Sequence, residues 1–353
     1  MRVWAGLLRI GLLLVVSCCV SESVVMDELM QVTSQACKTL KDRLRLQCEH
    51  PKDDFSAWQT GDSAPSTELE VIFASGNVDS KEIEAQTKLG LLQMVSAGYD
   101  GVDVGAATKA GIWVASAPTT KTGNGESVAE FAVLLMLAVS RRLNEELAAT
   151  HGQTKIPRKL GVNRALFGKT VCIVGLGGIG DLLMERLRGF GMILTGVDNH
   201  PENAPSGVKC YGHDELKLAA VDADYLVLAI PGTKENENMI DAPVLAAMKK
   251  NAVLVNIGRG ILVDESALLS AVKSGHLYGA GLDVVKDEPV SERNLLLMEP
   301  RILITPHIAG ATDLMLSGTV SYLGDVLAEF RQGLRSAGIV NEPKNPRVPL
   351  RDS

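Results

Sequence analysis

Residues 170–180 read T-V-C-I-V-G-L-G-G-I-G, and the rest of the fold can be worked out from them. The first five residues form a β-branched run that is typical of a strand buried on both faces. Gly175, Gly177 and Gly180 then fit the pattern G-x-G-x-x-G, and residues 181–190 are predicted to form the next helix. The first glycine allows a tight turn, the second lets backbone approach a pyrophosphate, and the third packs helix on strand. The stretch predicts a dinucleotide at the N-terminus of that helix, the alternative being a turn made only for packing.

A carboxylate 18 residues beyond Gly180 favours the dinucleotide. Residues 193–197 are predicted to form a second strand, and this strand ends at Asp198. A carboxylate here accepts hydrogen bonds from the adenosine ribose hydroxyls and repels a 2′-phosphate. We therefore expect the cofactor NAD, used as NADH. His200 could accept a phosphate only when its imidazole is protonated at low pH.

An arginine stands at the end of another β-branched run, residues 252–257. Arg259 is therefore expected to project from the carboxyl edge of a parallel sheet, where open α/β sheets bind ligands. Its planar guanidinium matches a carboxylate better than a lysine does. Arg259 is thus a candidate clamp for an acid substrate, and a surface arginine on a loop is the alternative.

A histidine and a glutamate form a candidate acid-base pair. His307 follows Thr-Pro, and by itself it would more often be a structural residue. Glu288 precedes a proline and lies in a turn after the predicted strand 279–284. A carboxylate bonded to one imidazole nitrogen fixes the tautomer and raises the histidine pKa. Such a histidine can donate a proton near neutral pH.

These motifs resemble those of the D-isomer-specific 2-hydroxyacid dehydrogenase family. M-K-K-N-A-V-L-V-N-I-G-R-G-I-L-V-D-E-S-A-L at 248–268 is similar to its arginine segment, G-L-D-V-V-K-D-E-P at 281–289 to its glutamate segment, and T-P-H-I-A-G at 305–310 to its histidine segment. The resemblance covers about residues 69–324. It implies that Arg259 orients the substrate carboxylate and that Glu288 partners His307, the acid-base group. Asp283 would then face the nicotinamide carboxamide.

Two earlier segments extend the resemblance. S-A-G-Y-D-G-V-D at 96–103 is similar to the family's substrate loop, whose backbone amides hold the carboxylate, and N-G-E-S-V-A-E at 124–130 is similar to the start of its long interdomain helix. The resemblance implies substrate contacts from Ala97, Gly98, Asn124 and Arg259. It implies cofactor contacts from Gly175, Gly177, Gly178, Ile179, Gly180, Asp198, Pro231, Ile257, Asp283 and Val128.

Two departures from the family's patterns bear on the substrate. Formate dehydrogenases carry glutamine where this chain has Glu288, so formate is not expected. The family's aromatic residues near the substrate have no clear counterpart in residues 156–169, which leaves the pocket size open. Two functions remain: an NAD-dependent reductase of a small 2-oxo acid, and a non-catalytic NAD-sensing protein of the corepressor type. The resemblance favours the reductase and implies a homodimer.

The composition agrees with an enzyme of two domains. The 353 residues are 46% hydrophobic, with a net charge of −7 and no basic tract, so neither nucleic acid nor membrane is an expected partner. The six cysteines show no metal-ligand spacing and no paired framework, so we expect reduced thiols and no metal.

The N-terminus has two interpretations. Residues 1–21 have the basic start and apolar run of a signal peptide, which would direct the chain to an organelle or the secretory route. The same run, residues 10–17, is also a good buried strand, with a helix predicted at 23–41, a strand at 44–48, a polar loop through residue 66 and a strand at 69–74. The family's substrate domain begins with such a strand, so we expect residues 1–21 to be retained and the protein to be cytoplasmic.

The predicted architecture is α/β with two domains. A Rossmann-type, doubly wound NAD-binding domain at 119–304 is inserted in a flavodoxin-like substrate-binding domain at 1–118 and 305–340, and 341–353 is predicted to be a flexible tail. The chain would cross between domains near Pro118 and Pro306, where a hinge is expected.

Overall fold

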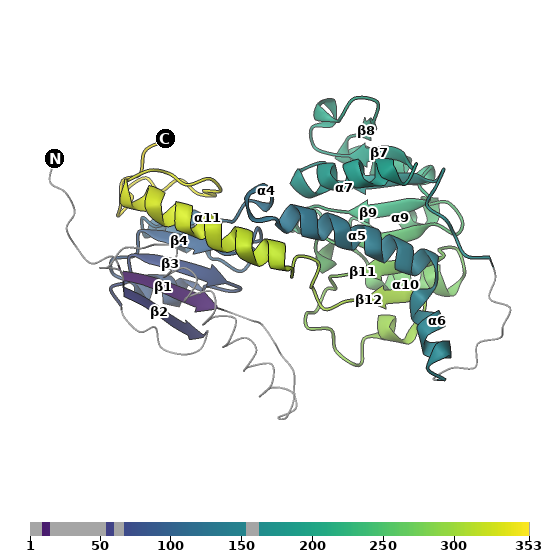
Figure 1. The fold of residues 1–353 in the computed structure, drawn as a ribbon, viewed down its shortest axis with the longest axis horizontal. Coiled ribbons are helices and arrows are strands. Elements are labelled where there is room, and N and C mark those ends of the chain that lie inside the picture. Colours follow the sequence, from purple (N-terminus) through teal and green to yellow (C-terminus); the bar gives the residue numbers. More distant parts are fainter. Residues whose placement is uncertain (1–8, 15–53, 60–66, 153–161, 353) are drawn as a thin grey trace. The chain divides into compact units, whose positions relative to one another are not determined.

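The computed structural model describes residues 9–14, 54–59, 67–152 and 162–352. The chain divides into two compact units (Figure 1). The discontinuous unit consists of residues 1–123 and 313–353, and the continuous unit of residues 124–312. Both contain a parallel sheet with helices, so the predicted α/β class is confirmed. Within the described residues, no helix is both long and apolar enough to cross a bilayer.

The continuous unit is built on a seven-stranded parallel sheet in the order β12-β11-β10-β9-β6-β7-β8. Its strands are β6 (Thr170–Val174), β7 (Ile193–Val197), β8 (Lys209–Tyr211), β9 (Tyr225–Leu228), β10 (Val253–Asn256), β11 (Gly279–Leu282) and β12 (Ile302–Ile304). The chain lays down β7 and β8 on one side of β6 and then returns to add β9 to β12 on the other. The order therefore reverses between β6 and β9, and such a point is where doubly wound sheets bind ligands at their carboxyl edge.

Helices cover both faces of this sheet. The helices of this unit are α5 (Asn124–Ser140), α6 (Leu143–Thr150), α7 (Gly178–Gly189), α8 (Leu216–Val221), α9 (Ala242–Ala247) and α10 (Glu265–Lys273), with 3-10 turns at Pro201–Asn203, His213–Glu215, Gly260–Leu262 and Leu295–Met298. Of these, α6 packs on α5 and not on the sheet. The period of two along β6 divides the core. Val171 and Ile173 pack in a cluster with α5 and α7, whereas Cys172 and Val174 pack with α8, α9 and α10. This explains why the strand reads as an unbroken apolar run.

The discontinuous unit has a five-stranded parallel sheet in the order β2-β1-β3-β4-β5, as flavodoxin-like folds have. Its strands are β1 (Arg9–Leu14), β2 (Asp54–Gln59), β3 (Val71–Ser75), β4 (Leu91–Met94) and β5 (Trp113–Ala115). Its helices are α2 (Ser80–Ala85), α3 (Val104–Lys109), α4 (Thr119–Thr122) and α11 (Asp313–Arg331). Phe73 and Trp113 pack with α11 on one face, and Ile72 and Val114 lie in a second cluster on the other.

The N-terminal predictions have different outcomes. Residues 10–14 of the apolar run expected at 10–17 lie in β1, which pairs with β2 on one side and β3 on the other, and residues 15–17 lie outside the described residues. The loop expected through residue 66 is wrong in part, because residues 54–59 form β2. Its pairing partner β1 lies far away in sequence, so the local polarity of residues 54–59 could not reveal that they form a strand. The predicted helix at 23–41 and strand at 44–48 lie outside the described residues.

The boundaries between the two compact units follow Gly123 and Thr312, whereas the sequence predicted boundaries after residues 118 and 304. Helix α4 packs against α11 and stays with the discontinuous unit, and residues 305–312 stay with the continuous unit.

The prediction of a flexible tail at 341–353 is corrected by contacts within the discontinuous unit. The Asn341 side chain accepts a hydrogen bond from the Val114 amide at 2.7 Å, and the Trp113 indole donates to the Val348 carbonyl at 2.9 Å. The Arg347 guanidinium donates to the Gln86 carbonyl at 2.6 Å. Residues 341–348 are therefore bound to the discontinuous unit.

Candidate active site

The glycine turn between β6 and α7 has the shape that the sequence predicted. Gly175 has φ +97°, a conformation that glycine adopts without strain. A Cβ at Gly180 would lie 2.0 Å from the Gly175 carbonyl oxygen, so only glycine lets the helix approach the strand this closely. Gly177 is the N-cap residue of α7, and a Cβ there would meet nothing within 4 Å. Space for a ligand is thus present at the N-terminus of this 12-residue helix.

Asp198 follows β7 and lies against the glycine turn. Its carboxylate accepts hydrogen bonds from the amides of Leu176 at 2.8 Å and His200 at 2.9 Å. Burial raises the pKa of Asp198, but these two hydrogen bonds, with charges on His200 and His213, outweigh burial and lower the pKa. An ionised carboxylate has roughly four acceptor positions, so it can also accept ribose hydroxyls. The turn, the helix terminus and this carboxylate together fit a dinucleotide.

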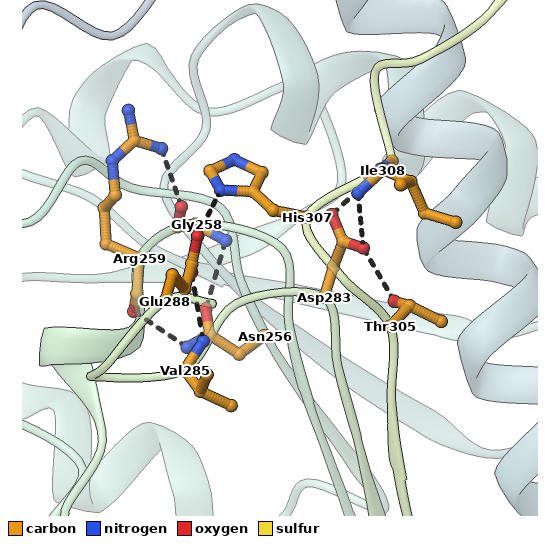
Figure 2. Close-up of polar contacts among 10 residues, drawn as sticks. Asn256, Gly258, Arg259, Asp283, Val285, Glu288, Thr305, His307 and Ile308 are labelled. Atoms are coloured by element: carbon orange, nitrogen blue, oxygen red, sulfur yellow. Dashed lines mark hydrogen bonds and ion pairs between the residues drawn. The ribbon is translucent and has the colours of Figure 1, made fainter. Parts of the chain in front are cut away.

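The loop after β10 presents Arg259. Its guanidinium donates to the Gly258 carbonyl at 2.8 Å (Figure 2). Asn256, fully buried at the end of β10, donates to the Arg259 carbonyl at 2.8 Å and accepts from the Gly258 amide at 3.0 Å. Asn256 therefore shapes the arginine loop. Sequence reasoning missed this role, although an amide in the run V-L-V-N-I was a usable signal.

His307 and Glu288 form the predicted pair. His307 Nδ1 lies 2.7 Å from Glu288 Oε2, and Glu288 Oε1 accepts from the Val285 amide at 3.2 Å. The hydrogen bond to Glu288 raises the pKa of His307 above its ordinary value, whereas partial burial and the Arg259 charge act in the opposite direction. Because Nδ1 faces the carboxylate, Nε2 is the nitrogen left to exchange a proton with a substrate. Figure 2 shows Arg259, Glu288 and His307 gathered in one place.

Asp283 holds the turn that carries His307. Its side chain is 2% exposed and accepts hydrogen bonds from the Thr305 hydroxyl at 2.6 Å and the amides of Ile308 and Ala309 at 3.0 and 2.9 Å (Figure 2). The His307 amide donates to the Asp283 carbonyl at 2.9 Å. These bonds support His307 at φ +54°, where a non-glycine residue is disfavoured by roughly 1–2 kcal/mol. A contact between Asp283 and the nicotinamide remains a prediction.

The remaining predicted residues lie in several places. Asn124 is the first residue of α5 and lies against Gly310, where a Cβ would come within 2.2 Å of the Asn124 Oδ1 atom. Val128 and Ile257 are buried in the core cluster that contains α5, whereas Pro231 is exposed and its carbonyl accepts from Asn236. Gly178 and Ile179 lie in the first turn of α7.

Ala97 and Gly98, the predicted substrate-loop residues, follow β4 in the discontinuous unit, and the Gly98 carbonyl accepts a hydrogen bond from the Ser96 hydroxyl.

Comparison with known proteins shows the family to which this chain belongs. The model of the D-isomer specific 2-hydroxyacid dehydrogenase NAD binding domain matches residues 133–309, which contain the glycine turn, Asp198, Arg259, Glu288 and His307. The chain belongs to the D-isomer specific 2-hydroxyacid dehydrogenase family. It is therefore an oxidoreductase that binds a nicotinamide cofactor and acts on 2-hydroxy acids or their 2-oxo counterparts.

Similar dehydrogenases include enzymes with different substrates. A glyoxylate reductase of Thermococcus kodakarensis is 35% identical over 280 residues, which cover 77% of this chain and 82% of the relative. A D-3-phosphoglycerate dehydrogenase of Methanocaldococcus jannaschii is 32% identical over 79% of this chain, but the match covers 53% of the relative. The structure of an NADPH-dependent glyoxylate/hydroxypyruvate reductase from Sinorhizobium meliloti has a TM-score of 0.73 at 26% identity, covering 97% of this chain and 99% of that one.

Proposed function

We propose that this dehydrogenase reduces a small 2-oxo acid to the D-2-hydroxy acid with NADH. The observation that carries the proposal is the 2.7 Å contact between His307 Nδ1 and Glu288, with Arg259 close enough to affect the histidine pKa. An acid-base imidazole beside a guanidinium suits a substrate that has a carbonyl next to a carboxylate.

His307 is proposed to protonate the carbonyl oxygen from Nε2. Glu288 holds the ring through Nδ1 and stabilises the imidazolium, which raises the pKa of His307 and keeps the proton on the ring to a higher pH. The nicotinamide, when bound, supplies the hydride that the carbonyl carbon accepts. In the oxidative direction His307 takes the hydroxyl proton back, and the same hydrogen bond to Glu288 then favours the charged ring.

Arg259 is proposed to bind the substrate carboxylate and so to orient the carbonyl toward His307. Its positive charge also acts against the rise in the pKa of His307 that Glu288 causes. An anionic substrate offsets that charge, so binding should favour the protonated histidine that reduction requires. Arg259 would thereby position the substrate and, once its charge is offset by the substrate carboxylate, allow His307 to be protonated.

The proposed substrates are glyoxylate and hydroxypyruvate. Glyoxylate reductases are among the relatives that this chain matches over most of their length, and the Sinorhizobium enzyme acts on both acids. Pyruvate and phosphohydroxypyruvate test the competing possibilities, the second because of the phosphoglycerate dehydrogenase relatives.

NADH is proposed as the preferred form of the cofactor, although the Sinorhizobium relative is NADPH-dependent. The proposal rests on Asp198, whose pKa is lowered and which lies at the glycine turn. A 2′-phosphate there would meet an ionised carboxylate, while ribose hydroxyls would find an acceptor.

A homodimer is also proposed. Large apolar side chains are exposed on neighbouring helices α5 and α6, where Leu134, Leu143 and Leu147 are 49%, 42% and 48% exposed. Covering them with a second copy would remove apolar surface from water. Light scattering after size exclusion should give twice the mass of one chain.

Retention of residues 1–21 and a cytoplasmic location are proposed from the place of β1. Cleavage near residue 21 would remove a strand that pairs with both β2 and β3. Mass-spectrometric reading of the mature N-terminus in the native cell should find residues before Ile10, and a terminus near Glu22 would contradict the proposal.

The decisive experiment measures NADH oxidation with glyoxylate, hydroxypyruvate, pyruvate and phosphohydroxypyruvate. His307→Ala should lower kcat by roughly 10²-fold to 10⁴-fold while NADH still binds, because the proton donor is lost. Near-normal turnover by the variant would make His307 structural. Tight NADH binding by the wild type without turnover of any acid would instead favour an NAD-sensing protein.

A further inference from the structure

The turn at residues 305–312 carries His307 and is anchored at its first half by Asp283. The Thr305 hydroxyl and the amides of Ile308 and Ala309 donate to that buried carboxylate. Ala309 is also 4% exposed and lies in a core cluster. This half of the turn is therefore fixed to the end of β11 (Figure 2).

The second half of the turn is anchored on a different element, the first turn of α5. Thr312 Oγ1 lies 2.6 Å from Ser127 Oγ, and Ser127 is 3% exposed. Two backbone bonds fold the segment between the anchors, from the Ala311 amide to the Ile308 carbonyl and from the Thr312 amide to the Gly310 carbonyl, both at 2.9 Å. These bonds join the residues beside Thr312 to Ile308, which follows His307 directly.

Helix α5 is a rigid support for this anchor. Val128, Ala129 and Ala132 pack in the same cluster as Val171 of β6 and Val255 of β10. The position of the Ser127 hydroxyl is thus fixed by a helix that packs on β6 and β10, and the arginine loop follows β10. The two hydroxyls connect the histidine turn to a helix that packs on the core cluster containing Val255 of β10.

We propose that Ser127 and Thr312 are positioning residues for His307. They do not touch the reacting atoms but fix the far end of the histidine turn through their hydroxyl pair. The inference rests on the proposed function of His307. Without the pair the turn gains freedom, the contact between His307 and Glu288 lengthens part of the time, and Nε2 leaves the position needed for proton transfer.

The test uses Ser127→Ala and Thr312→Val, with Thr312→Ser as the conservative variant that keeps the hydroxyl. Losing one hydrogen bond should reduce kcat by roughly three-fold to ten-fold. The KM for NADH should stay unchanged, and Thr312→Ser should retain activity near that of the wild type. Ser140→Ala is the matched control, because Ser140 is a fully buried hydroxyl at the other end of α5 that bonds to Met136 and Tyr225.

The pH dependence separates positioning from a general loss of stability. Glu288 and Asp283 favour the charged imidazole, and Arg259 disfavours it. If the contact with Glu288 loosens, the His307 pKa falls toward its ordinary value, and kcat/KM for reduction declines at a lower pH than in the wild type. Ser140→Ala should leave that profile in place even if it lowers Tm.

A measurement without turnover keeps this inference distinct from the proposed function. The His307 ring proton can be followed by NMR titration and assigned by its absence in His307→Ala. A lower titration midpoint in Ser127→Ala and Thr312→Val supports the positioning role, even if the wild type reduces none of the acids. An unchanged midpoint in both variants overturns it, whatever their activity.

Discussion

Replacement of Glu288 by glutamine should reveal how much the carboxylate contributes to the acid-base group. The change keeps the size and a hydrogen-bond acceptor but removes the negative charge 2.7 Å from His307 Nδ1. A hydrogen bond to a charged group is worth about 1.5–3 kcal/mol. Because the side chains are 50% and 35% exposed, solvent screening reduces the expected loss to about 1–2 kcal/mol. A loss of this size corresponds to a decrease of roughly 5-fold to 30-fold in the rate of proton transfer.

The sign of the pH effect follows from the direction of the pKa shift. The pKa of His307 is raised above 6.5 in the folded protein, so the protonated form persists to a higher pH than in a free histidine. Reduction should be constant at lower pH and decline as pH rises through the folded pKa. In Glu288→Gln the decline should begin at a lower pH. The stability that this pair contributes is likewise complete below 6.5 and lost as pH rises through the folded pKa.

The assay is kcat/KM for glyoxylate at saturating NADH, measured from pH 5 to 9 on wild type and variant. Asp287→Asn is the control, because it removes an exposed carboxylate from the adjacent position. It should leave the profile as in the wild type. If Glu288→Gln shows the same rates and the same pH profile as the wild type, the carboxylate does not support His307 and the reasoning fails.

Three further outcomes follow from the structure. Arg259→Lys keeps the charge but loses the planar fork, so kcat/KM for the acid should fall by a factor of about ten or more, with the Kd of NADH unchanged; equal efficiency would remove Arg259 from the site. Wild type should prefer NADH over NADPH by roughly 1.5–3 kcal/mol, or about ten-fold to more than a hundred-fold in kcat/KM; Asp198→Ala should narrow that ratio, and no narrowing would show that Asp198 does not read the ribose. A chain lacking residues 1–21 has no β1 between β2 and β3, so it should be mostly insoluble on expression; a soluble truncated protein with wild-type Tm would show that the sheet does not need this strand.

The local parts of the site could be predicted from the chain alone. A glycine turn, a β-branched strand and a carboxylate at the end of the next strand obey short-range rules of backbone geometry, and the positions of Gly175, Gly180 and Asp198 agree with those rules. The pairing of Glu288 with His307 was predicted from residue type and family motifs, and the 2.7 Å contact agrees with it.

Tertiary structure alone decided which groups satisfy one another across long stretches of sequence. The Asp283 oxygens accept hydrogen bonds from the turn at 305–309, and Ser127 meets Thr312 185 positions later. Strand β2 pairs with β1, 45 positions earlier, and the tail at 341–352 is bound at Asn341 and Arg347 by residues 227 and 261 positions away. A buried polar group must find a partner somewhere, but sequence periodicity specifies only that it is buried, whereas the folded chain specifies the partner.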